Sequence, residues 1–476
     1  MKNLPILLFL IICTIGAKAQ LLDSLQVQVG TTVSVASKDF LPLWLVSNRF
    51  GVISDQKFDF STHVKATNSN RFKFAADEKD DLILSYGVDA YNNDHLGKVF
   101  LAEAYAGLSY KNLKLRAGRF KQVIGEVDKD LSSGSLGVSG NALPVPKVSL
   151  SLDYTNVPFT NGWVQFKGLI SHGWMGEDQF MKNAFYHEKN LYVRLGKKKL
   201  KLYGGLQHYA VWGGTRDGYI TTGTSFSDFL DVLMVNIGND GDMNALRPNR
   251  AGDHRGVIEA GAEWENENMK ISLNNQTPFD MGQGIDIRNI DRLLSLNFVN
   301  KKKNAILKKV VLEFIHTTQM NDFFAIQYRE SYYNNGVYRT GWEYQDQIIG
   351  TPLFINRVRG SNFVEGIQPY DWNGPTSSIA PLSNIISNRV LGGHIGLMYK
   401  LTKDIDAKTM VTYTKNYGNN NPKYFNPAQS QMYSLQEVSW KVPRSQLSLS
   451  ASVAYDWGGL YDNFGSMVGL QWQLRN

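Results

Sequence analysis

The last two segments of the chain alternate strictly between apolar and polar residues, and this pattern limits what the chain can fold into. Residues 446–457 place apolar side chains at every second position, and residues 467–475 repeat the alternation after Gly458 and Gly459. A period of two is typical of a β-strand with one apolar face. Each segment has about the nine to eleven residues that a tilted strand needs to cross a bilayer. The pair therefore predicts the closing hairpin of a transmembrane β-barrel, with a half-buried hairpin of a soluble β-sandwich as the alternative.

The same alternation runs along most of the chain and predicts about eighteen strands, an even number, as a bacterial single-chain barrel requires. Residues 39–51 do not alternate, and we expect either a short helix tucked into the lumen or a folded loop there. The predicted strands are residues 25–35, 58–66, 82–91, 99–110, 113–120, 147–154, 163–174, 188–196, 200–212, 256–265, 268–277, 289–299, 305–318, 388–400, 404–416, 431–441, 446–457 and 467–475.

The connections between the predicted strands alternate between short and long. Residues 401–403 and 442–445 are short, whereas residues 213–255 and 319–387 are long. Short periplasmic turns and long extracellular loops are typical of outer-membrane barrels, and a sandwich has no reason to show this alternation. The predicted fold class is therefore all-β, a transmembrane antiparallel β-barrel with long extracellular loops.

The predicted inward face of the barrel carries charges of both signs. In a confined lumen such charges are expected to pair, which rigidifies the wall and narrows any pore. We therefore expect a lumen that is occluded by loops. The predicted inward residues are Asp59, His63, Lys65, Asp89, Glu103, Lys114, Arg116, Lys167, Glu259, Glu263, Lys309, Glu313, Asp406 and Lys408.

The N-terminal residues have the features of a bacterial export signal. Lys2 precedes an apolar run at residues 4–16 and an Ala-Lys-Ala cleavage motif, which predicts a signal peptide over residues 1–19 and a barrel over residues 20–476. The only cysteine, Cys13, lies inside the run, so we expect no disulfide or thiol chemistry in the processed chain. These features predict a location in the Gram-negative outer membrane.

The net charge of the chain is positive. The formal net charge is +7, and removing Lys2 and Lys18 with the predicted signal peptide leaves +5. A basic surface suits an anionic glycan or the phosphates of lipopolysaccharide. Solvated lysines in turns, such as residues 197–199, explain the charge equally well.

Motifs for catalysis or metal binding are missing from the sequence. There is no G-x-S-x-G, no H-E-x-x-H and no C-x-x-C, and we predict neither a catalytic residue nor a metal or cofactor. The segment from Asp240 to Asn244 has the spacing of a calcium loop, but Ala245 stands where glycine is required, which favours a polar loop. Four histidines fall on different predicted strands and are expected to be structural. They are His172, His208, His316 and His394.

The long segment at residues 319–387 combines aromatic residues with arginines. Aromatic rings pack on the C–H faces of sugars, and arginine hydrogen-bonds to hydroxyl and carboxylate groups. The mixture predicts a polysaccharide-binding platform, with a barrel cap that packs on itself as the alternative. The candidate binding residues are Tyr332, Tyr333, Tyr338, Trp342, Tyr344, Trp372, Arg357 and Arg359.

One internal segment resembles a known family. Residues 133–150 contain Ser139, Asn141, Pro144 and Pro146 in an order that is similar to the S-x-N-A-x-P-x-P segment of the Wzi family of capsule assembly proteins. Residues 42–51 and 166–174 resemble the Bacteroidetes branch of that family. The chain departs from enterobacterial members, which begin with a periplasmic helical bundle and carry a tryptophan-rich segment where this chain has residues 120–125.

The resemblance implies a lectin-like outer-membrane barrel, without enzymatic activity, that holds exported capsular polysaccharide at the cell surface. The partners it implies are capsular or other surface polysaccharide, outer-membrane lipid and lipopolysaccharide, with a polysaccharide export channel as a further candidate. A monomer is expected, and nucleic acid is excluded by the predicted location. A porin or transporter for oligosaccharides is the first alternative, and an outer-membrane barrel hydrolase is the second.

Overall fold

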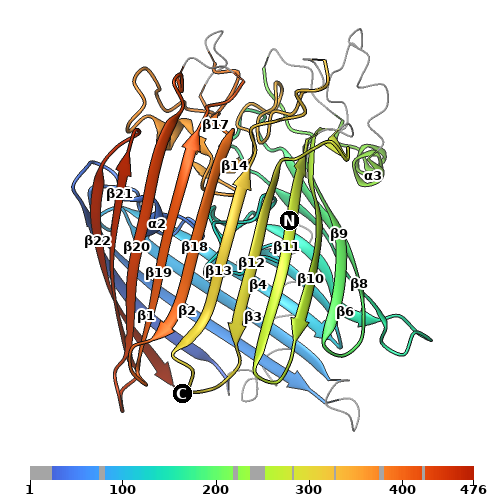
Figure 1. The fold of residues 1–476 in the computed structure, drawn as a ribbon, viewed down its shortest axis with the longest axis vertical. Helices are drawn as coiled ribbons and strands as arrows, with labels where there is room; N and C mark the ends of the chain where they lie inside the picture. Colours follow the sequence, from blue (N-terminus) through green and yellow to red (C-terminus); the bar gives the residue numbers. More distant parts are fainter. Residues whose placement is uncertain are drawn as a thin grey trace, which may run out of the picture.

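The computed structural model is a closed barrel of 18 antiparallel strands (Figure 1). Consecutive barrel strands pair with each other, and β1 (Gln26–Ala36) pairs with β22 (Asn463–Arg475) to close the sheet. The predicted fold class and the predicted number of strands are confirmed. The structure describes residues 24–73, 81–217, 223–235, 252–280, 284–325, 329–374, 380–420 and 424–475. The predicted signal peptide and the segment from Asp240 to Asn244 lie outside these ranges.

The other barrel strands follow the chain in order around the wall. They are β2 (Phe58–Phe72), β3 (Leu82–Asn93), β4 (Lys98–Tyr110), β5 (Leu113–Arg119), β6 (Lys147–Asn156), β7 (Val164–Trp174), β8 (Phe185–Leu195), β9 (Leu200–Trp212), β10 (Asp253–Glu265), β11 (Met269–Phe279), β12 (Arg292–Asn300), β13 (Leu307–His316), β18 (Val390–Lys400), β19 (Ile405–Asn416), β20 (Gln429–Lys441) and β21 (Leu447–Gly458).

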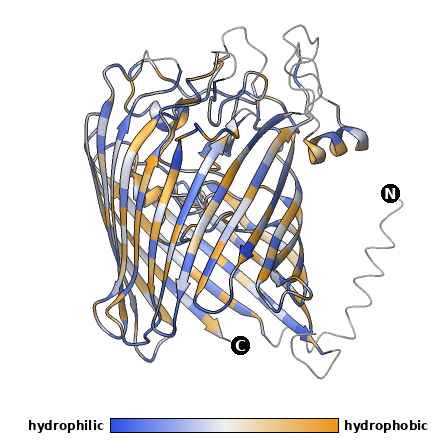
Figure 2. Cartoon of the chain, turned by 45° about the vertical axis from the view of Figure 1, so that its right-hand side comes forward, coloured by the Kyte–Doolittle hydropathy of each residue, from blue (hydrophilic) through white to orange (hydrophobic). Residues whose placement is uncertain are grey.

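The outward face of the wall is apolar. On β21, Val453, Tyr455 and Trp457 are exposed, while Ala454 and Asp456 between them are buried. Successive side chains of a strand point to opposite faces, so the alternation in the sequence becomes an inside and an outside. Figure 2 shows polar and apolar residues alternating along the strands. This outer belt, defined by the exposed apolar side chains of the strands, is a surface that lipid can cover.

The inward face is held together by ion pairs, as its mixed charges predict. Lys65 lies 3.0 Å from Glu103, and the fully buried Lys147 lies 2.6 Å from Glu188. The carboxylate of Glu263 forms ion pairs with three basic side chains from neighbouring strands. These are Arg194 at 3.3 Å, Lys201 at 3.4 Å and Lys270 at 2.7 Å. In these ion pairs a partner of opposite sign offsets the cost of removing each charge from water. Other inward carboxylates, such as Glu259, accept hydrogen bonds from neutral side chains instead.

Residues 120–146, between β5 and β6, run through the lumen and are called the plug below. The carboxylate of Glu313 on β13 accepts hydrogen bonds from the Ser132 hydroxyl and from both the amide and the hydroxyl of Ser133, at 2.6 to 2.7 Å. The amide of Leu136 donates to the side chain of Gln276 on β11 at 2.9 Å. Inward polar residues of the wall therefore bind the plug backbone, and the expected occlusion of the lumen has a physical basis.

The segment predicted as a helix or loop contains α2 (Leu43–Val46), which lies within the barrel. The amide of Leu43 donates to Asp456 at 2.7 Å, and the indole of Trp44 donates to Thr412 at 3.0 Å. Both partners face inward, so this short helix fills the lumen beside the plug. Among the described residues, no helix is long and apolar enough to cross a membrane.

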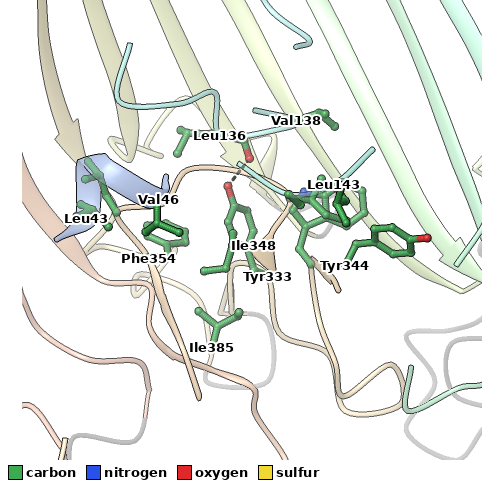
Figure 3. Packing of buried hydrophobic residues seen from close by; sticks show 14 of the residues in the cluster. Leu43, Val46, Leu136, Val138, Leu143, Tyr333, Tyr344, Ile348, Phe354 and Ile385 are labelled. Atoms are coloured by element: carbon green, nitrogen blue, oxygen red, sulfur yellow. Dashed lines mark hydrogen bonds between the residues drawn. The ribbon is translucent and has the colours of Figure 1, made fainter. Parts of the chain in front are cut away.

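The long loops contribute the remaining elements. These are α3 (Phe226–Met234), β14 (Glu343–Tyr344), β15 (Gln347–Ile348), β16 (Ile355–Asn356), α4 (Arg357–Gly360) and β17 (Ile385–Ser387). Residues 329–374 and 380–389 form a cap over the plug, and their apolar side chains share one core with α2 and the plug (Figure 3). The core of this protein therefore lies inside the barrel.

The anchoring of the plug predicts how the barrel conducts ions. In planar bilayers we expect the unmodified protein to show little or no steady conductance. Glu313→Ala removes three hydrogen bonds and leaves buried serine donors unpaired, at about 1–3 kcal/mol each, so openings should become frequent. Glu365→Ala, at an exposed position of the cap, is the matched control. A large steady conductance of the unmodified protein would contradict the occluded lumen.

Candidate functional site

The serine and asparagine of the predicted family motif join the plug to the cap. The Ser139 hydroxyl donates to the carbonyl of Gly350 at 2.6 Å, and the Asn141 side-chain amide donates to the carbonyl of Ile348 at 2.9 Å. The Asn141 backbone amide donates in turn to the Ser139 hydroxyl at 3.1 Å. Both side chains are buried, so their role in this structure is to fix the β14–β15 hairpin on the plug.

The two prolines of the motif lead the plug into β6. Pro144 and Pro146 are half-buried, and the carbonyl of Pro146 accepts the amide of Trp174 at 3.1 Å. Proline has a fixed φ and no amide donor, so it stiffens a segment that enters a strand. The motif residues therefore position other groups and present no polar side chain to solvent.

The candidate aromatic residues come together, but in the interior of the cap. The Trp342 indole lies between the rings of Tyr186 and Tyr209, with centroids 5.5 and 5.3 Å away, and donates to the carbonyl of Gly137 at 2.7 Å. The Tyr333 hydroxyl donates to the carbonyl of Leu136 at 2.6 Å, drawn as a dashed line in Figure 3. Aromatic rings with polar edges thus pack the cap onto the plug.

The other candidate rings are equally enclosed. Tyr332 donates to Asp291 at 2.8 Å, and Tyr338 donates to the carbonyl of Gly213 at 3.1 Å. Exposure is 5% or less for all six candidate rings, Tyr332, Tyr333, Tyr338, Trp342, Tyr344 and Trp372. This burial matches the alternative expectation of a cap that packs on itself. A sugar-stacking role for these rings stays a prediction.

The two candidate arginines hold loop backbones. Arg359 donates to Asp55 at 2.8 Å and to the Tyr461 hydroxyl at 3.0 Å, and Arg357 donates to the carbonyl of Ser383 at 3.0 Å. Burial of Arg359 would lower its pKa, but the neighbouring Tyr461 and Asp55 outweigh this and raise the pKa. Arg359 therefore stays charged inside the cap.

Glu343 is a buried acid at the centre of the cap. Its side chain accepts hydrogen bonds from the amides of Asn356 and Asn384, both at 2.6 Å. Removal from water raises the pKa of Glu343 to about 8, although the amide from Asn356 acts in the opposite direction. Three separate segments of the cap meet at this carboxyl group.

A small polar hollow lies between α2, the plug and residues 346–359, with a volume of about 50 Å³. Asp346, at its edge, is exposed, so the hollow reaches the surface of the cap. It has room for a few water molecules, at about 10–15 Å³ for each, so we expect a sugar ring to rest at its mouth. The polar residues that line it are Ser47, Asp55, Asn141, Asp346, Gln347, Asn356 and Arg359.

The hollow combines residues that sequence analysis singled out with others that it missed. Arg359 and Asn141 were candidates, whereas Asp55, Asp346 and Gln347 were not. These residues come from segments far apart in the chain, and no local pattern links them. Carboxylate, amide and guanidinium groups side by side can accept from and donate to sugar hydroxyls.

A larger cavity of about 520 Å³ lies below the plug, toward the short turns. Lysines and arginines contribute much of its lining, but their charge is largely matched within the protein. Lys114 lies 2.5 Å from Asp153, Lys167 pairs with Glu126, and Lys270 lies 2.7 Å from Glu263. The plug separates this cavity from the cap.

The four histidines singled out in the sequence lie on four different strands, as predicted, but two of them have histidine neighbours that the sequence did not reveal. His172 lies directly opposite His187 on the adjacent strand, and Nε2 of His208 lies 2.9 Å from Nδ1 of His254. His394 agrees with the structural role expected, because its ring bonds to Thr412 and to the plug. Within the ranges that the structure describes, no group of three or more potential ligands is arranged to hold a metal ion.

The sequence of this chain matches one known protein family. The sequence profile of the family described as "Capsule assembly protein Wzi" matches residues 42–355. Among curated proteins, none matches the chain in sequence. The resemblance of the motif segments to the Wzi family is thereby confirmed, while membership of its Bacteroidetes branch stays a prediction.

Several solved structures are similar to the chain. Wzi of Escherichia coli is described as an outer membrane protein involved in group 1 capsule assembly and as a carbohydrate-binding β-barrel. It is 14% identical, with 97% of this chain and 87% of that chain covered and a TM-score of 0.55. OpdQ of Pseudomonas aeruginosa is 7% identical, with 95% and 97% covered and a TM-score of 0.49.

OmpT of Vibrio cholerae is a third solved barrel with similarity to the chain, at 10% identity, 96% and 100% coverage and a TM-score of 0.38. At 14% identity, the likeness to Wzi of Escherichia coli shows the fold alone. The family profile, in contrast, covers well over half of the sequence. This outer-membrane β-barrel therefore belongs to the family of the capsule assembly protein Wzi.

Proposed function

We propose that this protein binds capsular polysaccharide at the cell surface and holds it there without covalent chemistry. The observation that carries the proposal is the plugged lumen under a tightly packed cap. The outer end of this closed barrel is a rigid surface. Polar side chains on a rigid surface lose little conformational entropy when a ligand binds, which suits the surface for binding a polymer. Family membership supports the same role.

A porin or transporter for oligosaccharides is less well supported. Such a protein needs a continuous polar path, whereas here Leu131 and Ser135 of the plug have no solvent exposure. Ser133 and Leu136 are bonded to wall residues Glu313 and Gln276. Opening a path would require these buried hydrogen bonds to break.

A hydrolase is also less well supported. Ser132 and Ser133 donate to Glu313, and Ser139 donates to a backbone carbonyl. Besides a base such as this carboxylate, a serine nucleophile needs an open approach for the substrate. These hydroxyls have structural partners in a buried region, which favours binding over catalysis.

The mouth of the polar hollow is the proposed contact with the polymer. Asp346 and Gln347 lie at its accessible side. At its base, Arg359 donates a hydrogen bond to Asp55. In this proposal the buried rings around Trp342 support the platform from below. The polymer meets the polar rim, where hydroxyl groups can replace solvent as hydrogen-bond partners.

Other partners in the proposal follow from the barrel itself. The apolar outer belt is suited to outer-membrane lipid and lipopolysaccharide acyl chains. Closure through β1 and β22 completes the sheet within one chain, so the barrel needs no second copy to close, and a monomer is proposed. A polysaccharide export channel is proposed as the source of the polymer.

Gln347→Ala tests the proposed contact. The substitution removes a half-buried amide at the hollow and leaves the charge of the protein unchanged, so its effect does not depend on the charge of the polymer. We expect affinity for purified surface polymer, measured with detergent-solubilised protein, to fall roughly fivefold, or about 1 kcal/mol.

The matched control for this experiment is Gln368→Ala, at an exposed position of the cap outside the hollow. It should bind as well as the unmodified protein. An unchanged affinity for Gln347→Ala, or an equal loss in both variants, would move the contact elsewhere on the cap.

Glu343→Gln tests whether the cap is held together by this acid. The pKa of Glu343 is raised to about 8 in the folded cap, so between about pH 4.5 and 8 the folded form keeps a proton that the unfolded form has lost. Cap stability should therefore fall as pH rises through this window. Glutamine resembles the protonated acid and should remove most of this dependence.

The measurement is the rate of limited proteolysis of the cap from pH 5 to 8.5, corrected with an unstructured peptide at each pH. The rate should rise several-fold in the unmodified protein and much less in Glu343→Gln. Glu365→Gln, an exposed glutamate of the same region, should behave as the unmodified protein does. Identical profiles for all three proteins would refute a central role for Glu343.

A further inference from the structure

Helix α3, in the long loop between β9 and β10, lies against the outside of the barrel (Figures 1 and 2). Its Val232 has no solvent exposure and packs with Ala210 and Trp212 of β9. Phe229 contributes to the same contact, and the ammonium group of Lys189 donates to the carbonyl of Leu233. The helix is thus attached to the wall by apolar packing and by one bond to its backbone.

The start and end of α3 are encoded locally. Ser225 and Asp228 form a capping box, in which the Ser225 hydroxyl accepts the Asp228 amide at 3.2 Å and Asp228 accepts the Ser225 amide at 2.8 Å. Val235 ends the helix in a left-handed conformation with φ of 55°. Such caps satisfy the unpaired amides at a helix start.

The wall beneath α3 is unusually polar for an outward surface. On β8, Tyr186 and Glu188 face the lumen, because Glu188 bonds to Lys147, so His187 between them faces outward. His208 faces outward for the same reason on β9. Yet His187 has no exposure and His208 has only 4%. The ring of Phe229 lies 5.9 Å from that of His187, so α3 shields these histidines from lipid.

The side of α3 that does not touch the wall carries an apolar stripe. Phe226, Leu230 and Met234 are spaced by four residues and share one face, with exposures of 74%, 41% and 74%. Asp228 and Asp231 share a different face. Successive residues of a helix are rotated by about 100°. The helix therefore has three faces in turn: one that packs on the wall, one that carries the apolar stripe and one that carries the two aspartates.

We propose that α3 is an interfacial anchor whose stripe of Phe226, Leu230 and Met234 inserts into the acyl chains of the outer leaflet. A helix that lies in the corner between the barrel wall and the membrane surface needs two adjoining apolar faces and one polar face. α3 has this distribution. Amphipathic helices of this kind lie in the plane of the membrane interface.

Continuity with the outer belt identifies lipid as the occupant of the stripe. Trp174, at the end of β7, is 47% exposed on the outside of the wall, and its ring lies edge-on to His172, 5.3 Å away. His172 in turn contacts Phe229 of α3, with ring centroids 5.6 Å apart. A row of aromatic rings thus extends from the belt through Trp174 and His172 to the helix.

Cysteine labelling tests the proposal directly. Leu230→Cys, labelled with an environment-sensitive fluorophore, would be reconstituted in phosphatidylcholine vesicles that carry a nitroxide on the acyl chain. We expect quenching by the nitroxide to be roughly threefold stronger than for the matched Asp231→Cys label, which lies on the acidic face. Aqueous iodide should show the opposite order. Heat-modifiable migration in electrophoresis verifies that each barrel is folded.

Equal access of iodide to both labels would overturn the proposal. Protection of the Leu230→Cys label from both quenchers would also overturn it, because it would place protein and not lipid on the stripe. A second variant, with Phe226, Leu230 and Met234 all changed to Ser, keeps the wall contact of Val232 intact. In vesicles its α3 segment should be cleaved by protease roughly tenfold faster than in the unmodified protein. An unchanged cleavage rate would contradict the anchor.

Discussion

Closure of the sheet is the constraint on which the rest of this structure depends. The interior of a bilayer offers no water to backbone amides, so every strand needs a partner on both sides. The pairing of β1 with β22 removes both edges, and its register, such as Val33 opposite Val468, decides which side chains face inward. A shift of β1 by one residue would turn the exposed Val33 toward the lumen and the buried Ser34 toward lipid.

The polar interior and the plug stabilise each other. Wall residues such as Glu313 need hydrogen-bond donors, and the irregular backbone of the plug needs acceptors. Ser139 and Asn141 extend this network to the cap by donating to the carbonyls of Gly350 and Ile348. In the opposite direction, the indole of Trp342 in the cap donates to the plug. The cap is therefore held from below at the segment around Trp342 and Gly350, which suits it for binding a polymer without a closing motion.

The strands could be predicted from the sequence because their pattern is local. Alternation over ten residues reports the environment of a strand directly, and the lengths of connections report which end faces outward. Whether an aromatic ring in a loop points inward or outward is not determined by the neighbouring sequence. Trp342 is buried because of Gly137, Tyr186 and Tyr209, which lie on other parts of the chain. The polar hollow depends in the same way on contacts between distant residues.

Retention of capsule on intact cells tests the central claim, that this barrel holds polymer and does not make or transport it. After deletion of the gene, total capsular polymer and its chain length should stay unchanged, while the cell-attached fraction falls and the fraction in the medium rises. Restoring the gene should reverse the shift. An unchanged attached fraction, or loss of polymer synthesis altogether, would contradict this account.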